Sequence, residues 1–333
     1  MSKRDRALRI AGGCGVAFAG LSAYASFAAR RFEDLEPESA DVPGRFLDVD
    51  GVRFHYVEAG QGEPVVLIHG LSASTFSFRY TIPELAQSYR VVALDLQGFG
   101  YSERPAGADY SLTALAEQVA RVMDRLDIER ATVVGHSMGG AVAMRLAIGF
   151  PERVARLVLV NSATDRMLRR SLRLSRLIQP LMPIGALFAL QRRAFRRRAL
   201  RRAVHDPAHV TPEVVEGGFR PRRVKGTLRA LGAWLVDRGR DEPLAPERVT
   251  QPTLVLWGEH DRWLPPAEGE ALARAIPNAR LVLVPSSGHL PLEEQPNFCN
   301  RALLDFLGSP EASVVPADYS STPATEPRQP IDQ

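Results

Sequence analysis

The chain has 333 residues, of which 45% are hydrophobic and 24% are charged, a composition typical of a soluble globular protein with a sizeable core. The two cysteines, Cys14 and Cys299, lie near opposite ends of the chain and do not indicate a disulfide framework. The net charge of +4 conceals two basic segments: residues 161–240 hold 19 Lys and Arg against 5 Asp and Glu, and residues 1–31 hold 6 against 1. Such asymmetry makes phospholipid or nucleic acid the anionic partners to consider.

The first segment, residues 1–31, contains an uncharged run from Ile10 to Ala29 with basic residues on both sides. As a helix this run would span about 30 Å, the thickness of a hydrocarbon core. We predict a membrane anchor that leaves the rest of the chain on the extracytoplasmic side. Two alternatives stay open: a cleaved secretory signal ending near Ala23-Tyr24-Ala25, which would give a secreted protein, and a buried core helix.

Short apolar runs after residue 41 predict β-strands, and several are apolar at every position, as in a parallel sheet that is buried on both faces. Asp50-Gly51 predicts a hairpin between the first two strands. Apolar spacing near 3.6 predicts helices between the later strands, the first with Ser111 as its N-cap. This alternation indicates a doubly wound α/β fold. The predicted strands are 46–50, 53–58, 64–69, 90–95, 131–135, 156–160, 253–257 and 280–284, and the predicted helices are 111–126, 267–276 and 296–307.

The alternation stops between Ala163 and Arg248, where the chain is rich in arginine and contains no convincing strand. We therefore predict a core domain of residues 32–162 and 249–307, interrupted by a helical insertion at 163–248. Residues 308–333 are rich in Pro, Ser and Thr and predict a disordered tail.

The segment Gly135-His136-Ser137-Met138-Gly139-Gly140 follows a predicted strand and begins a predicted helix. Small residues on both sides of a serine permit a sharp strand-to-helix turn that exposes its hydroxyl, and the helix N-terminus supplies N–H groups for an oxyanion. The pattern predicts Ser137 as a nucleophile; the alternative is a glycine-rich turn that serves only close packing.

A serine nucleophile needs a base and an acid that orients it. His289 follows the last predicted strand, where the chain order serine, acid, histidine expects the base. Asp261 follows the strand before it and is the predicted acid, with Glu259 and Asp165 as alternatives. The oxyanion donors are predicted to be the N–H groups of Met138 and of Leu71, which follows His69-Gly70.

Together these motifs resemble the α/β-hydrolase superfamily, over about residues 46–307. Its pattern is present in order as His69-Gly70, Asp95 followed by Gly98-Phe99-Gly100, the serine segment, Gly258 with Asp261, and Gly288-His289. The resemblance implies an eight-stranded, mostly parallel sheet with a helical cap after the sixth strand, a non-catalytic Asp95, and no metal or cofactor. A serine at the turn differs from the aspartate nucleophile of haloalkane dehalogenases and epoxide hydrolases. The serine segment is more similar to that of esterases, monoacylglycerol lipases and carbon–carbon bond hydrolases.

We predict hydrolysis of a carboxylic ester with an apolar acyl chain, from a small-molecule or lipid-like substrate, through an acyl-Ser137 intermediate. Carbon–carbon bond hydrolysis and acyl transfer would use the same residues and stay open as alternatives. A non-catalytic binding protein on a hydrolase fold is the alternative of another class.

Residues 188–204 combine apolar positions at helical spacing with seven arginines. Such a helix could lie on an anionic bilayer and add to membrane association through residues 10–29, or its apolar stripe could pack over the active site. Nucleic acid is not an expected partner, because no aromatic platform accompanies the charge. Six of them lie largely away from the apolar positions: Arg192, Arg193, Arg196, Arg197, Arg201 and Arg202.

Overall fold

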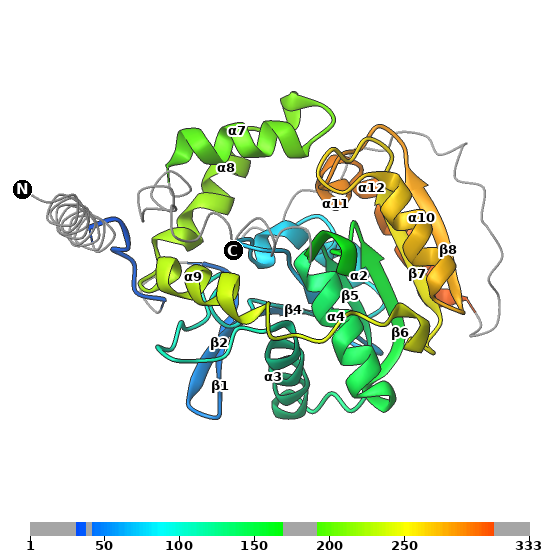
Figure 1. Ribbon diagram of the computed structural model, residues 1–333, viewed down its shortest axis with the longest axis horizontal. Coiled ribbons are helices and arrows are strands. Elements are labelled where there is room, and N and C mark those ends of the chain that lie inside the picture. Colours follow the sequence, from blue (N-terminus) through cyan, green and yellow to red (C-terminus); the bar gives the residue numbers. More distant parts are fainter. Residues whose placement is uncertain (1–30, 38–41, 169–191, 310–333) are drawn as a thin grey trace, which may run out of the picture.

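The computed structural model describes residues 31–37, 42–168 and 192–309, shown in colour in Figure 1. The predicted disordered tail and the predicted anchor at 10–29 lie outside the described residues. The domain boundaries at the two ends of the chain therefore stay predictions.

One sheet of eight strands forms the centre of the fold, in the order β1-β2-β4-β3-β5-β6-β7-β8. β1 and β2 are antiparallel to their neighbours, and all pairs from β4 to β8 are parallel. The predicted α/β-hydrolase type of sheet is confirmed. The strands are β1 (Arg45–Val49), β2 (Val52–Ala59), β3 (Pro64–Ile68), β4 (Arg90–Leu94), β5 (Ala131–His136), β6 (Val154–Val160), β7 (Thr253–Gly258) and β8 (Ala279–Val284).

The turn between β1 and β2 has the predicted hairpin chemistry. Val49 pairs with Val52, so Asp50 and Gly51 form a two-residue loop. Both have positive φ, 53° and 78°, which is the requirement of a type I′ turn and is met readily by Asp-Gly. The hairpin thus places β1 antiparallel to β2.

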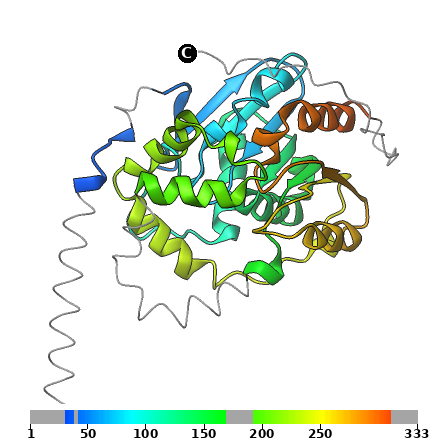
Figure 2. The ribbon, with the colours of Figure 1, turned by 90° about the horizontal axis from the view of Figure 1, so that it is seen from above.

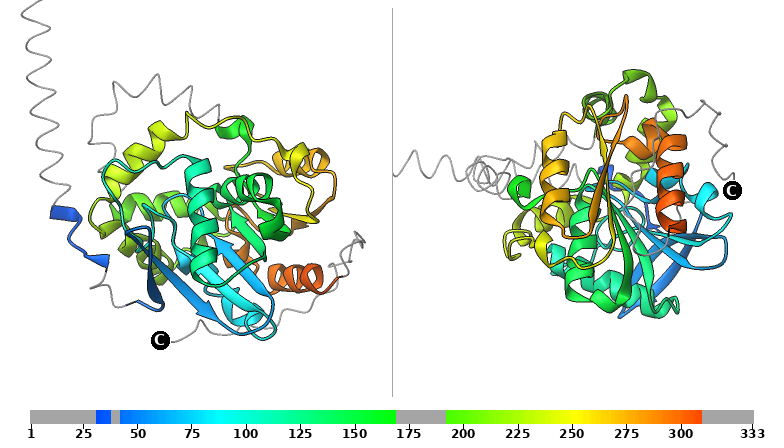
Figure 3. Two further views of the ribbon diagram at one scale, coloured as in Figure 1. Left: turned by 90° about the horizontal axis from the view of Figure 1, so that it is seen from below. Right: turned by 90° about the vertical axis from the view of Figure 1, so that its right-hand side faces the viewer.

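Helices cover both faces of the sheet (Figure 3, right). One apolar layer joins the sheet to α3 (Leu112–Arg125), α4 (Met138–Gly149) and α10 (Pro266–Ala275), and a second joins it to α2 (Ile82–Leu85) and α12 (Pro296–Gly308). Ser111 accepts a hydrogen bond from Ala114 N at 3.2 Å, so α3 begins at the predicted N-cap. The two layers hold the loops at the carboxyl ends of the strands in place.

In the described residues between β6 and β7, helices lie over the carboxyl end of the sheet (Figures 1 and 2). They include α7 (Arg193–Ala203), α8 (Pro212–Phe219) and α9 (Thr227–Asp237). We call residues 192–248 the cap. Arg104, from the core, fastens it: its guanidinium donates to Pro221 O at 3.1 Å and to Thr227 Oγ1 at 2.9 Å. A buried carboxylate, Glu33, adds hydrogen bonds from the N–H groups of Gly226 and Leu228.

The predicted membrane-anchored location is corrected. Within residues 31–37, 42–168 and 192–309, no helix has both the length and the apolar character needed to cross a bilayer.

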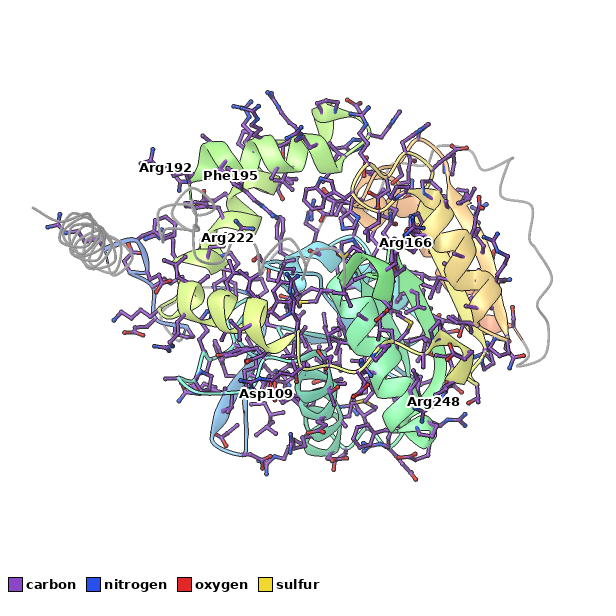
Figure 4. The ribbon with its side chains drawn as sticks, in the orientation of Figure 1. Asp109, Arg166, Arg192, Phe195, Arg222 and Arg248 are labelled. Carbon is purple, nitrogen blue, oxygen red and sulfur yellow. The ribbon has the colours of Figure 1, made fainter. Side chains whose placement is uncertain are left out.

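Of the two alternatives for the arginine-rich helix, the structure of α7 favours packing within the protein over a membrane-facing stripe. Leu200 is buried with Val204, Val210 and Val215 in a small apolar cluster inside the cap. Phe195 is 40% exposed, so the apolar stripe is not continuous along the helix. Figure 4 shows Arg192 at the outer end of the cap and Arg222 between α8 and α9. The apolar half of α7 therefore packs within the protein.

Candidate active site

Ser137 occupies the turn between β5 and α4 in a strained conformation, with φ 53° and ψ −118°. Such a conformation costs of the order of 1–3 kcal/mol and persists only where the surroundings impose it. Here Ser137 N donates to Val160 O at 3.0 Å, while its carbonyl accepts from Gly140 N and Ala163 N. The backbone around Ser137 is thus fixed from three sides.

Glycines make this turn possible because neighbouring backbone fills the space of a side chain. A Cβ on Gly135 would lie 2.3 Å from Gly139 O, and a Cβ on Gly139 would lie 2.2 Å from Ile68 O. A Cβ on Gly70 would lie 3.1 Å from the Ser137 Cβ, so the loop after β3 closely approaches the serine.

The three residues of the predicted triad meet at the carboxyl edge of the sheet. The Ser137 Oγ is 3.1 Å from His289 Nε2, and His289 Nδ1 is 2.7 Å from Asp261 Oδ2. They come from the loops after β5, β8 and β7, which lie at one edge because these strands are parallel. The chain order serine, acid, histidine thus becomes a continuous hydrogen-bonded path in space.

Asp261 is buried and has the partners that a permanent anion needs. Burial opposes its ionisation, but the hydrogen bond and charge of His289, the Leu264 N–H and the Asn161 amide outweigh burial and lower the pKa of Asp261. Trp263 N and Leu264 N donate to Oδ1 at 2.7 and 2.9 Å, which leaves Oδ2 for His289. The carboxylate is therefore ready to orient the imidazole and to stabilise its charged form.

The alternative acids have other partners. Glu259 is exposed, and its nearest ionic partner is His260 at 4.0 Å. Asp165 accepts a hydrogen bond from Leu244 N at 3.2 Å in the loop that enters the cap.

The other buried histidines have structural partners. His136 donates from Nε2 to His289 O at 2.8 Å, and burial, with the nearby charge of His289, lowers the pKa of His136 to about 3. His69 donates from Nδ1 to Gly70 O and accepts at Nε2 from Leu96 N. His55 Nδ1 lies 2.8 Å from Asp95 Oδ2. His136 and His69 are therefore fixed as neutral rings beside the serine.

The predicted oxyanion donors flank the serine. Within the described part of the chain, the Leu71 N–H has no hydrogen-bond acceptor, and Met138 is the first residue of α4, where an N–H has no partner inside the helix. The N-terminus of α4 adds a partial positive charge at the same point. Both groups are available to a developing negative charge.

Two neighbours of the triad were missed from sequence. The side chain of Asn161, at the end of β6, donates from Nδ2 to Asp261 Oδ2 at 2.6 Å and accepts from Gly258 N at 3.1 Å. The Trp263 ring centroid lies 5.0 Å from that of His289, and Trp263 is 48% exposed. The only signal for either was position, since Asn161 directly follows β6, which lies beside β7, and Trp263 comes two residues after the predicted acid.

No group of three His, Cys, Asp or Glu side chains in the described ranges could hold a metal ion. The chemistry available from these residues is nucleophilic attack with general base assistance.

Comparison with known proteins decides the family. Residues 63–296 match the sequence profile of the alpha/beta hydrolase fold. The chain belongs to this family. Among its relatives, the uncharacterized hydrolase YugF of Bacillus subtilis is 32% identical over 277 residues, covering 80% of this chain and 98% of that protein. The 2-hydroxymuconate semialdehyde hydrolase of Pseudomonas sp. (strain CF600) is 31% identical over 289 residues, covering 84% and 99%.

Solved structures of alpha/beta hydrolases superpose over most of the chain. A meta-cleavage product hydrolase from Pseudomonas fluorescens IP01 gives a TM-score of 0.67 at 27% identity, covering 80% of this chain and 97% of that one. A membrane phospholipase A, described as a bacterial virulence factor, also gives 0.67, at 26% identity, covering 91% and 96%. The chain is a hydrolase of this family.

Proposed function

We propose that this hydrolase cleaves carboxylic esters with an apolar acyl chain, through an acyl-Ser137 intermediate. The observation that carries the proposal is the hydrogen-bonded path from Ser137 Oγ through His289 to Asp261, with separations of 3.1 and 2.7 Å. A strained serine held at this distance from an oriented imidazole is the arrangement that acyl transfer requires.

In the proposed reaction, His289 Nε2 accepts the Ser137 proton as Oγ attacks the ester carbonyl. The N–H groups of Leu71 and Met138 donate to the oxyanion of the tetrahedral intermediate, each contributing about 3–4 kcal/mol to the transition state. His289 then protonates the departing alcohol, and an ester bond joins the acyl group to Ser137. Attack by water, with His289 again as the base, releases the acid and restores the serine.

Exposed apolar side chains beside the triad support an apolar acyl group. Leu71, whose N–H is a predicted oxyanion donor, is 37% exposed, and Trp263 is 48% exposed beside the His289 ring. Large apolar side chains are more often buried, so two of them at the site offer a surface that an acyl chain would cover. The phospholipase A similarity is consistent with such a substrate.

A panel of p-nitrophenyl esters from acetate to dodecanoate tests the proposal. We expect hydrolysis that is abolished in Ser137→Ala and a kcat/KM that rises with chain length as apolar surface is buried. Rates equal to those of Ser137→Ala for every ester would overturn ester hydrolysis.

Carbon–carbon bond hydrolysis is a second candidate, favoured by the semialdehyde hydrolase and the meta-cleavage product hydrolase among the similar proteins. A ring-cleavage semialdehyde assayed beside the ester panel separates the two. Turnover of the semialdehyde at a kcat/KM well above that of the best ester would favour this candidate.

A further inference from the structure

The loop that carries His289 is held by side chains and backbone from outside the triad. His289 N donates to Ala203 O, the last residue of α7, at 2.6 Å. His289 O accepts from the His136 Nε2–H at 2.8 Å. The base of the triad is thus bonded to the cap on one side and to the residue before the nucleophile on the other.

A buried carboxylate completes this arrangement. Glu294, at the end of α11 (Pro291–Glu294), is 3% exposed and accepts the N–H groups on both sides of the histidine. Gly288 N and Leu290 N donate to its Oε1 at 2.9 and 3.2 Å. Its Oε2 accepts from His205 N, in the cap, at 2.6 Å.

The cap and the histidine loop are in close contact at this point. A Cβ on Gly288 would lie 2.2 Å from Ala203 O and 2.8 Å from His205 N, so only glycine fits against this turn of the cap. The His205 ring stacks on His260, next to the proposed acid, with centroids 4.1 Å apart. The end of α7 therefore contacts the loops of both Asp261 and His289.

Resting on the proposed function, we propose that Glu294 is a positioning residue that joins the cap to the catalytic histidine and sets the distance from His289 Nε2 to Ser137 Oγ. Proton transfer depends steeply on this distance, and a displacement of about 1 Å can cost a hundredfold in rate. With all three N–H groups of residues 288–290 bonded to Glu294 or the cap, a change in the cap is transmitted to the base.

Burial supports a role beyond packing. It raises the pKa of Glu294 even though three N–H groups donate to the carboxylate, so the ionised form is stabilised less than in water. An apolar residue or a neutral amide would avoid this cost, and costly groups of this kind are typical of functional positions.

Glu294→Gln tests the proposal because an amide has one acceptor oxygen where the structure needs two. If the oxygen serves Gly288 and Leu290, the amide NH₂ faces the His205 N–H, and the bond to the cap is lost. We expect kcat on the best ester to fall about ten- to a hundredfold with KM little changed, since substrate contacts are untouched.

Glu293→Gln is the matched control. It removes the neighbouring carboxylate of α11, which pairs with Arg79 at 2.7 Å and does not bond to the histidine loop. We expect a lower melting temperature with kcat close to wild type. If the two variants lose kcat equally, or if Glu294→Gln keeps wild-type kcat, the proposal is overturned.

The bond to the cap is tested separately at position 205. His205→Pro removes the N–H that donates to Glu294, whereas His205→Ala keeps it and removes only the ring. Val204 is extended, with φ −84° and ψ 155°, which permits a following proline. We expect a lower kcat in the proline variant alone. Equal kcat values in the two variants would show that the bond between the cap and Glu294 does not position His289.

Should the proline variant not fold, the kcat of Glu294→Gln still tests the proposal. A wild-type protein that hydrolyses no ester would instead count against the proposed function.

Discussion

At the sheet lie two buried aspartate–histidine pairs. They differ in the group that is hydrogen-bonded to the second ring nitrogen of the histidine. Asp95 pairs with His55 at 2.8 Å, and Asp261 pairs with His289 at 2.7 Å. His55 Nε2 is hydrogen-bonded to the carbonyl of Pro43, whereas His289 Nε2 is hydrogen-bonded to the Ser137 hydroxyl. The same pair of groups can therefore fasten a loop in one region and activate a nucleophile in the other.

The partners of each aspartate agree with this division. Asp95 accepts the backbone N–H groups of Thr75 and Tyr101, which holds the loops after β3 and β4 together. Asp261 accepts the backbone N–H groups of Trp263 and Leu264, in its own loop, at Oδ1, and its Oδ2 meets His289 and Asn161. We interpret the first pair as structural and the second as catalytic.

The largest effect on kcat is expected from Ser137→Ala, which removes the hydroxyl that is hydrogen-bonded to His289 of the Asp261–His289 pair. Without the hydroxyl no acyl-enzyme forms, and kcat should fall about 10⁵- to 10⁶-fold with the fold intact. Steady-state ester hydrolysis and a thermal unfolding curve measure both. Residual activity within tenfold of wild type would mean that another residue is the nucleophile.

The same substitution in the two aspartates should have opposite consequences. Asp261→Asn should lower kcat about 10⁴-fold with little loss of stability, because the amide favours the wrong tautomer of His289. Asp95→Asn breaks a buried ion pair and should cost about 3–5 kcal/mol in the free energy of unfolding. Its kcat per folded molecule should stay near wild type. A large loss of kcat in folded Asp95→Asn would contradict the interpretation of the Asp95–His55 pair as structural.

A smaller effect on catalysis is expected from Asn161→Gly. The residue has φ 40°, which glycine adopts without strain, so the substitution removes the amide and leaves the backbone as it is. Loss of the bond to Asp261 should lower kcat about tenfold. Asn300→Ala, a buried amide that donates to Tyr80 O, is the control and should affect stability alone. Unchanged kcat in Asn161→Gly would show that Asp261 needs no support from β6.

The smallest effect is a pH-dependent one at the structural pair. Burial opposes charge on both groups, but their mutual attraction outweighs it, so the pKa of His55 is raised above 6.5 and the pKa of Asp95 is lowered below 3.8. The histidine contribution to stability is complete below pH 6.5 and is lost as pH rises through its raised pKa. The aspartate contribution is complete above pH 3.8 and is lost as pH falls through its lowered pKa. The melting temperature lost in His55→Gln should therefore be largest between these two values. A loss that is constant from pH 3 to pH 9 would contradict the charged pair.

The sequence was sufficient to predict most of the fold, because its signals are local. The apolar runs mark all eight strands to within two residues, and Asp50-Gly51 and Ser111 mark the first turn and the start of α3. The predicted Ser137, His289 and Asp261 are brought together, since strand ends in a parallel sheet share an edge. Asn161 and Glu294 could not be found in this way. The role of Asn161 depends on the register of β6 against β7, and that of Glu294 on how the cap meets the histidine loop. Both are contacts between segments far apart in sequence.

The central claim is that Ser137 is activated by His289, and covalent labelling tests it most directly. A fluorophosphonate incubated with the protein, followed by mass spectrometry of its peptides, should give one adduct, on Ser137. The adduct should be absent from Ser137→Ala, formed slowly in His289→Ala, and formed at nearly the wild-type rate in Asp95→Asn. No adduct on Ser137, or equal labelling rates with and without His289, would contradict the account.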